Sequence, residues 1–409
     1  MQFGSGEIKT DDNGDKSDMK SSVKNGFKDM ASMDWEFINS NTSYATHNFH
    51  RYSSKFIPQI AANLIKIFSK RDDTVLDVFA GSGTTLVESK ILGRNSIGID
   101  LNPLACLISR VKSRNINDKL SREVKEIFFK KVATQIYIAR NGQGRIHVPS
   151  FQSVELWFQS QVLRELSVIT NEIKSIDNLC IKEFAICALS AIIRSVSNAK
   201  SGFGNLMIDK EKRKITNTFE LFERQLLKMV DGMHEFNSLM NHKVKSKVYH
   251  GDARDINFIK DDCIDLIVTH PPYIASVPYA EYQKLSMNWL GASFPELFNG
   301  RYGENIQPRN LDRNIVGGRR GRKDVVERFL RDMDKVFGEM HRALKRNKFC
   351  CVVIGNPVVI GKEIELNRIL VDIAKGRGFY FEEEIIRGKY KTTMGKMKKE
   401  YILIFRKGR

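Results

Sequence analysis

One strand–turn–helix–strand unit constrains the fold of this chain more than any other part of its sequence. The apolar run at residues 74–79 (TVLDVF) ends in a glycine turn and precedes a predicted helix at residues 84–92. A second apolar strand is predicted over residues 95–99 and is closed by Asp100. Strands joined through a helix by short connections are typical of a parallel α/β sheet. We therefore expect an α/β fold with a doubly wound, Rossmann-like sheet.

Further apolar runs extend this sheet to seven predicted strands. Beyond the first two, strands are expected at residues 247–250, 264–268, 349–354, 380–386 and 401–405. The last two would form an antiparallel hairpin around a basic loop at residues 387–399. A helix is predicted from Pro58 to Phe68, where apolar residues recur at helical spacing.

The alternation of strands and helices stops between residues 110 and 245. Apolar residues there recur at steps of three and four, which is typical of packed helices, for example Val162, Leu166, Ile169 and Ile173. Residues 1–40 are rich in Lys, Asp, Ser and Asn and are expected to form a disordered tail. We therefore expect a sheet domain built from residues 41–109 and 246–409, with a large helical insertion at 110–245 as a candidate target-recognition region.

The chain is strongly basic, with 66 Lys and Arg against 48 Asp and Glu, a formal net charge of +18. Such a balance favours a polyanionic partner, because phosphate neutralisation releases counterions. The basic residues cluster at 386–409, where Glu400 is the single acid, and at 308–323, where Asp312 is the single acid. The second cluster supplies the candidate nucleic-acid-binding residues Arg309, Arg313, Arg319, Arg320, Arg322 and Lys323.

Other classes of protein are disfavoured by what the sequence lacks. No apolar run approaches the roughly 20 residues that a membrane span needs, and the first 20 residues show no apolar signal region. The six cysteines have no paired spacing, so neither a metal site nor a disulfide framework is indicated. A soluble protein of the reducing bacterial cytosol or nucleoid, without a membrane or metal partner, is expected.

The glycine turn after the first strand (DVFAGSGTT, residues 77–85) is the first motif that points to a ligand. A dinucleotide site would carry a third glycine where Leu86 stands, and the Walker pattern is also absent, so the loop suits a ligand without phosphates. Asp77 could pair with an ammonium group, and Asp100 could accept both ribose hydroxyls. A nucleoside that carries an ammonium group but no phosphate describes S-adenosylmethionine, although a plain strand-to-helix turn remains the simpler alternative.

The second motif, THPPY at residues 269–273, directly follows a predicted strand. Two prolines stiffen the loop and remove two N–H donors, which leaves a rigid edge of hydrogen-bond acceptors. An exocyclic amino group becomes nucleophilic when its N–H groups donate to such acceptors, here the His270 side chain and the Pro271 carbonyl. Tyr273 could stack on a base taken out of the helix. A proline-stiffened turn would explain Pro271 and Pro272, but not their position after a strand of this sheet.

Together these motifs resemble those of the amino-methylating DNA methyltransferases, which act on cytosine N4 or adenine N6. The resemblance covers residues 47–109 and 246–407 and begins with a motif at residues 50–58 (HRYSSKFIP), whose counterparts line the methionine end of the cofactor. It implies direct methyl transfer, with the catalytic residues His270, Pro271, Pro272 and Tyr273. It also implies S-adenosyl-L-methionine bound by Lys55, Phe56, Asp77, Phe79, Gly81, Gly83, Thr84, Asp100 and Asp252.

One position departs from the family pattern. The first catalytic position is Ser in most cytosine-N4 enzymes and Asp or Asn in most adenine-N6 enzymes, whereas this chain has His270. A neutral imidazole can accept a hydrogen bond only above its pKa, about 6.5 when unperturbed. The preceding Thr269 favours the cytosine-N4 group, so we expect site-specific methylation of cytosine N4 in double-stranded DNA, with a cognate restriction endonuclease as a candidate partner.

Several alternatives remain open at this stage. They are adenine-N6 methylation, an RNA or protein amino-methyltransferase, and an inactive DNA-binding subunit in which His270 marks a decayed site. Tyr279 and Trp289 could touch DNA, but aromatic residues in such a stretch are more often core residues. His47 and His250 are expected to be ordinary loop or strand residues.

Overall fold

The computed structural model describes most of the chain. The described residues are 27, 30, 33–53, 56–115, 132–141, 148–201, 206–274, 279–298, 308–318, 324–359, 362–388 and 399–408. In this part of the chain, no helix combines the length and the apolar character that a membrane span requires.

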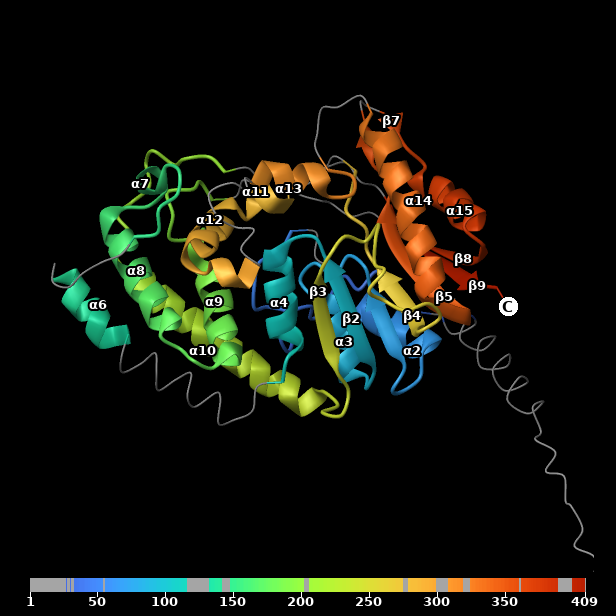
Figure 1. The fold of residues 1–409 in the computed structure, drawn as a ribbon, viewed down its shortest axis with the longest axis horizontal. Coiled ribbons are helices and arrows are strands. Elements are labelled where there is room, and N and C mark those ends of the chain that lie inside the picture. The colour runs from blue at the N-terminus through green and yellow to red at the C-terminus, as the bar shows by residue number, and fades with distance from the viewer. Residues whose placement is uncertain are drawn as a thin grey trace, which may run out of the picture.

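A seven-stranded sheet forms the centre of the molecule (Figure 1). Its strands lie in the order β3-β2-β1-β4-β5-β9-β8, and β9 is the strand that runs antiparallel to its neighbours. This arrangement confirms the predicted doubly wound sheet and its closing antiparallel hairpin. The bounds are β1 Thr74–Asp77, β2 Asn95–Asp100, β3 Ser246–His250, β4 Ile264–Thr269, β5 Leu344–Gly355, β8 Phe379–Arg387 and β9 Glu400–Lys407, with a separate ribbon of β6 Val358–Val359 and β7 Lys362–Glu363.

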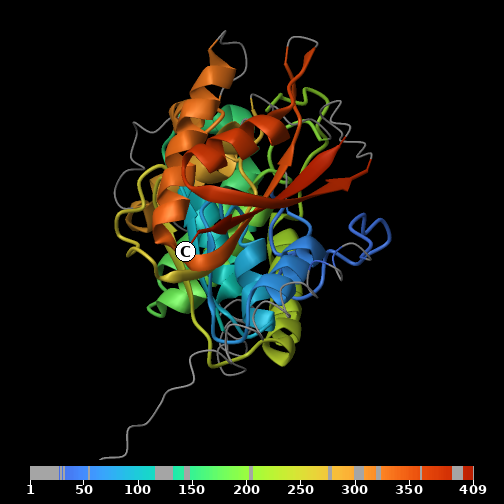
Figure 2. The same cartoon turned by 90° about the vertical axis from the view of Figure 1, so that its right-hand side faces the viewer.

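Helices cover both faces of the sheet (Figure 2), which explains why its central strands are buried on both sides. Every residue of β4 is buried, and successive side chains serve opposite faces. Leu266 and Val268 pack against α2, whereas Ile267 belongs to the cluster that contains α14 and α15. The helices on the α2 face are α2 Pro58–Phe68, α3 Thr84–Ile91 and α4 Pro103–Ser113, and those on the other face are α14 Val325–Ala343 and α15 Leu366–Gly376.

A helical body lies beside the sheet and docks on α4 (Figure 1). Its apolar stripes meet in one buried cluster, as the spacing of the apolar residues predicts. The expected boundary at residue 110 falls inside α4, which contacts both β2 and α9. The helices of this body are α6 Ala133–Arg140, α7 Val154–Trp157, α8 Ser160–Lys174, α9 Leu179–Ile193 and α10 Thr218–Leu239.

The segment after the THPPY motif joins the sheet to this body. Its elements are α11 Tyr279–Tyr282, α12 Lys284–Ser293, the 3-10 turn η2 Pro295–Phe298 and α13 Pro308–Asn314. Trp289 of α12 is fully buried in the helical core, and its indole N–H donates to Oγ1 of Thr170 at 3.0 Å. The helical core therefore draws on a part of the chain that lies well beyond residues 110–245.

The disordered tail expected over residues 1–40 does not extend over its described C-terminal part. Met30 and Trp35 are buried, 2% and 5% exposed, in the core cluster that also holds β5 and β9 residues. The Arg387 guanidinium of β8 donates to the Trp35 carbonyl at 2.6 Å. The polar composition of residues 1–40 as a whole hid this docking site, to which Phe27, Met33 and Phe37 also contribute.

The packing of α3 on β2 can be tested at Gly98. A Cβ atom at this position would lie 2.9 Å from both Cδ atoms of Leu86 and 3.0 Å from Cβ of Ala80. We expect Gly98→Ala to lower the free energy of unfolding by about 1–3 kcal/mol, because overpacking forces neighbours apart. Urea unfolding followed by circular dichroism measures the change.

The matched control is Gly376→Ala near the end of α15, where a Cβ would meet nothing within 4 Å. That substitution should leave the stability unchanged or raise it by up to about 1 kcal/mol, since Ala has the higher helix propensity. Equal stability of the two variants would contradict the close contact between α3 and β2.

Candidate active site

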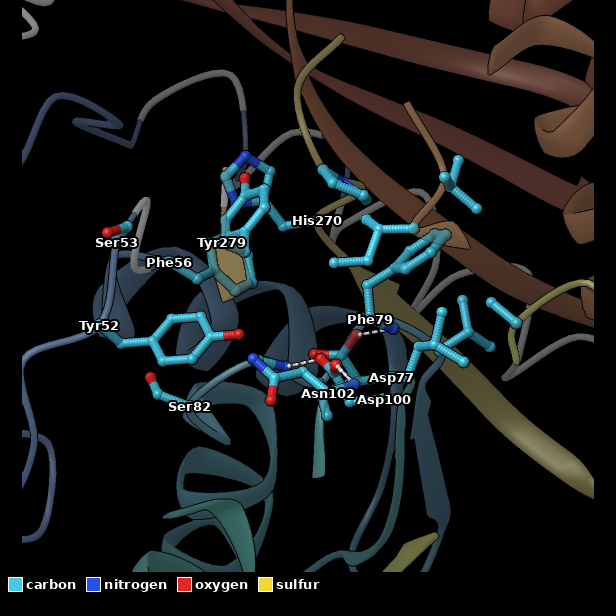
Figure 3. A pocket seen from close by; sticks show the side chains of 18 of the residues that line it. Tyr52, Ser53, Phe56, Asp77, Phe79, Ser82, Asp100, Asn102, His270 and Tyr279 are labelled. Carbon is cyan, nitrogen blue, oxygen red and sulfur yellow. Dashed lines mark hydrogen bonds between the residues drawn. The ribbon is translucent and has the colours of Figure 1, made fainter. Parts of the chain in front are cut away.

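A cavity lies at the carboxyl ends of β1, β2 and β4 (Figure 3). The chain leaves β1 toward β2 on one side and later returns to β4 on the other, so the site occupies the point where the strand order reverses. Parallel strands bring their carboxyl ends to one edge, which is why residues far apart in the sequence meet here. The sequence-predicted residues that line the cavity are Phe56, Asp77, Phe79, Gly81, Thr84, Asp100, Asp252, His270 and Pro272.

Asp100 closes β2 and is held by two backbone donors. Its Oδ2 accepts from the Gly81 N–H at 2.8 Å, and its Oδ1 accepts from the Asn102 N–H at 2.8 Å. Burial raises the pKa of Asp100 to about 6, although these two hydrogen bonds favour the ionised form. Each carboxylate oxygen has a second acceptor site, so Asp100 can still bind ligand hydroxyl groups.

Asp77 ties the glycine loop to the strand before His270. Its Oδ1 accepts from Thr269 Oγ1 at 2.7 Å and from the Phe79 N–H at 3.0 Å, and its Oδ2 accepts from Thr85 Oγ1 at 2.7 Å. Burial raises the pKa of Asp77, and these three hydrogen bonds act in the opposite direction. The carboxylate thus joins the ends of β1 and β4.

Gly83 permits the close approach of the loop to α4. Its φ is +81°, and a Cβ there would lie 2.9 Å from Cα of Ser109. Any other residue would be strained by the backbone conformation and by this contact with a neighbouring main chain. Gly83 therefore shapes the loop, and it is not among the residues that line the cavity.

Asp252 follows β3 and lies at the cavity wall. Arg254 donates to it through Nε at 2.9 Å and through Nη2 at 2.6 Å. Burial opposes ionisation, but the hydrogen bonds and charge of Arg254 outweigh it and lower the pKa of Asp252. Arg254 also contacts Asp332 on α14, which fixes the pair against the sheet domain.

His270 lies at the other end of the cavity from Asp77 and Asp100 (Figure 3). Its Nε2 is 2.8 Å from Oη of Tyr273, whose hydroxyl donates to Oε1 of Glu400 at 2.9 Å. The imidazole also faces the Phe56 ring, with 5.6 Å between ring centroids. Burial lowers the pKa of His270, which the Glu400 charge raises and the Arg387 charge lowers, so the imidazole stays neutral to a more acidic pH than usual.

The remaining sequence-predicted residues fall into two groups. Pro271 and Tyr273 lie in the same loop as His270 but do not line the cavity, and the Tyr273 hydroxyl points to β9 instead. Arg313 is exposed on α13, directly before cavity-lining residues 314–316. Outside what the structure describes lie Lys55, Arg319, Arg320, Arg322, Lys323 and the side chain of Arg309.

Several residues of the site were not predicted. Asn102 lines the cavity, and Glu400 contacts the THPPY loop from β9. Glu400 carried a usable signal, since it is the single acid in the basic stretch 386–409. The other single acid, Asp312, accepts from the Ala280 and Glu281 N–H groups at the start of α11.

The structure shows the surroundings of the aromatic and histidine residues whose roles the sequence left open. Tyr279 faces the cavity, whereas Trp289 is core. His47 is buried and 2.6 Å from Oε1 of Glu88, so it is a structural partner of α3. His250 bonds the Leu101 carbonyl at 3.0 Å as an ordinary strand residue.

The charges that line the cavity fit a cationic nucleoside. Three aspartates line it, and no Lys or Arg is found among the described lining residues. Such a wall would repel phosphate groups but suits ribose hydroxyls and a positively charged sulfonium. The described residues contain no group of His, Cys, Asp and Glu arranged to hold a metal ion.

The sequence matches known methyltransferases. The model of a family described as "DNA methylase" matches residues 6–110. The Type II methyltransferase M.MvaI of Kocuria varians is 26% identical over 377 residues, which cover 83% of each chain. The Type II methyltransferase M.MjaII of Methanocaldococcus jannaschii is 25% identical over 324 residues, which cover 58% of this chain and 60% of the relative.

Among solved structures, the putative DNA modification methylase TTHA0409 of Thermus thermophilus, complexed with S-adenosyl-L-methionine, is 21% identical, with a TM-score of 0.25 over 39% of this chain and 52% of that one. The sheet order, the acid-lined cavity at its switch point and the sequence matches agree with the motifs at residues 77–85 and 269–273. These matches confirm the resemblance of this chain to the amino-methylating, S-adenosyl-L-methionine-dependent DNA methyltransferases.

Proposed function

We propose that this protein methylates N4 of cytosine at a specific sequence in double-stranded DNA. The observation that carries the proposal is the shared cavity of Asp100 and His270, a ribose acceptor at one end and an amine acceptor at the other. The proposed cofactor contacts are those expected from the sequence, with Lys55 and Phe56 at the methionine end and Asp100 and Asp252 at the nucleoside end. When bound, S-adenosyl-L-methionine supplies an electrophilic methyl group.

The catalytic loop prepares the target amine. The imidazole of His270 accepts one amino hydrogen, and the Pro271 carbonyl accepts the other. Both contacts draw the amine lone pair out of conjugation with the ring and hold it toward the cofactor end of the cavity. The proton lost from the methylated amine passes to solvent. Stacking on the extruded base is better supported for Tyr279, which lines the cavity, than for Tyr273, whose hydroxyl is bound to Glu400.

The basic segment at 308–323 supports a nucleic-acid substrate. Cavity residues 314–316 belong to it, so its six basic residues are close to the cavity wall in the sequence. Phosphate contacts of this kind fix the register on the duplex but carry no sequence information. We propose the helical body as the source of base contacts. The Type II methyltransferase relatives support a partner endonuclease.

The choice of cytosine over adenine rests on Thr269, which resembles the cytosine-N4 pattern. Its hydroxyl also donates to Asp77, a contact that would serve either target base. Adenine N6 is therefore the second candidate.

The product identifies the target base. We expect DNA from an unmethylated host that expresses the protein to yield N4-methylcytosine after digestion to nucleosides and mass spectrometry. His270→Ala should lower the methylation rate about 100-fold or more, because the amine loses one preorganised acceptor. N6-methyladenine as the product would transfer the proposal to the second candidate.

If the protein methylates tRNA or another protein and leaves DNA unmodified, the assignment of DNA as its substrate is wrong. A radiolabelled methyl-acceptor assay on duplex DNA, tRNA and protein makes that comparison. Cofactor binding by a protein that labels none of the three would indicate an inactive binding subunit.

Cofactor binding should weaken as the pH falls through about 6. Protonation of Asp100, whose pKa burial raises to about 6, removes its charge and one acceptor. Below that pH we expect the Kd for S-adenosyl-L-methionine to rise up to about tenfold per pH unit in isothermal titration calorimetry.

Asp100→Asn is the matched control for this titration. We expect it to weaken binding about 10- to 100-fold at pH 8, which corresponds to a lost charged hydrogen bond, and to flatten the dependence between about pH 5 and 7. An unchanged pH profile in the Asn variant would show that another group titrates.

A further inference from the structure

We propose that Glu400, acting through Tyr273, fixes the tautomer of His270 so that Nδ1 is the unprotonated acceptor offered to the target amine. Glu400 is a positioning residue, since it touches neither the cavity nor a ligand. The inference rests on the proposed function, in which His270 accepts a hydrogen bond from the amine. The observation that supports the inference is a continuous row of hydrogen bonds from Arg387 through Glu400 and Tyr273 to His270.

The row begins with a buried ion pair. The Arg387 side chain is fully buried, and its Nη1 bonds Oε2 of Glu400. The same guanidinium donates to the Trp35 carbonyl at 2.6 Å. A buried guanidinium without an anion would be costly, so this pairing keeps Glu400 as a carboxylate. A carboxylate accepts hydrogen bonds and donates none.

The direction of the next two hydrogen bonds follows from proton counting. The Tyr273 hydroxyl has one hydrogen, and its oxygen lies 2.9 Å from Oε1 of Glu400 and 2.8 Å from Nε2 of His270. Because the carboxylate has no hydrogen to give, the Tyr273 hydroxyl donates to Glu400. Its oxygen must then accept from His270, which puts the imidazole proton on Nε2.

A neutral imidazole carries one N–H, so a proton on Nε2 leaves Nδ1 with a free lone pair. Among the described residues Nδ1 of His270 has no hydrogen-bond partner, and the ring lines the cavity. Nδ1 is therefore the atom that can accept from the amine. In the opposite tautomer an N–H would face the amino hydrogens, two donors would meet, and the first catalytic contact would be lost.

Glu400→Gln tests this hydrogen-bonded row. The variant keeps the shape of the side chain at position 400 but reverses the direction of the hydrogen bonds from there to His270. Arg387 carries only donors, so it claims the amide oxygen and turns the NH₂ group toward Tyr273. The Tyr273 hydroxyl must then accept from the amide and donate to Nε2 of His270, which moves the proton to Nδ1. We expect kcat to fall about 10- to 1,000-fold, while the KM for S-adenosyl-L-methionine changes less than about twofold.

Nitrogen-15 NMR of protein labelled at histidine reads the tautomer without activity. We expect Nε2–H for His270 in the unmodified protein and Nδ1–H in Glu400→Gln, with the signal assigned by its loss in His270→Asn. The matched control is Glu382→Gln on β8. Its ion-pair partner, Arg406, lies near the end of β9, whereas Glu400 is the first residue of that strand. That variant should leave kcat and the His270 tautomer unchanged.

A double-mutant comparison separates an effect of Glu400 on the His270 tautomer from a general loss of structure at the site. An Asn side chain at position 270 has no tautomers, so Glu400→Gln should cost much less in the His270→Asn background than in the unmodified protein. Equal losses in the two backgrounds, full kcat in Glu400→Gln, or Nδ1–H in the unmodified protein would each overturn the inference. If the unmodified protein methylates no DNA, the proposed function fails, and the NMR experiment still decides the tautomer.

Discussion

The hydrogen bond from the Thr269 hydroxyl to the Asp77 carboxylate, 2.7 Å long, joins the two halves of this site. β1 carries the cofactor loop and β4 carries the catalytic loop, and the two strands pair directly in the sheet. Because the bond spans their carboxyl ends, a shift of either loop would break it and expose a buried carboxylate. The separation of these two loops, which hold the proposed methyl-donor and amine-acceptor sites, is thus set by the sheet, as a transfer between two bound groups would require.

The net charge of the whole chain is opposite in sign to the charge of the side chains that line the cavity. The chain as a whole carries a formal charge of +18, which attracts a polyanion over long range. The cavity, in contrast, is lined by three aspartates, and its described lining residues include no Lys or Arg. The surface can therefore gather nucleic acid while the interior selects a cation. In the proposed reaction, a neutral His270 adds no positive charge beside the sulfonium.

One short segment of the chain connects the helical body to the THPPY loop. Helix α12 follows that loop and buries Trp289 among α8 and α9 residues, while α13 returns to the cavity wall. Contacts made by the body can in this way reach the loop through one short segment. The same segment explains why sequence boundaries drawn at 110 and 245 describe the helical core incompletely.

The sequence by itself determined the strands, the glycine loop, Asp100 and the THPPY motif, because each depends on neighbours that are close in the chain. Only the tertiary structure decided that Trp35 docks on the sheet, that Tyr279 faces the cavity while Trp289 does not, and that Glu400 lies within hydrogen-bonding distance of Tyr273, the partner of His270. These contacts join residues that are far apart in the chain, 127 positions between Tyr273 and Glu400 and 352 between Trp35 and Arg387. Local patterns encode backbone preference and burial, whereas the partner of a buried charge depends on which strands become neighbours.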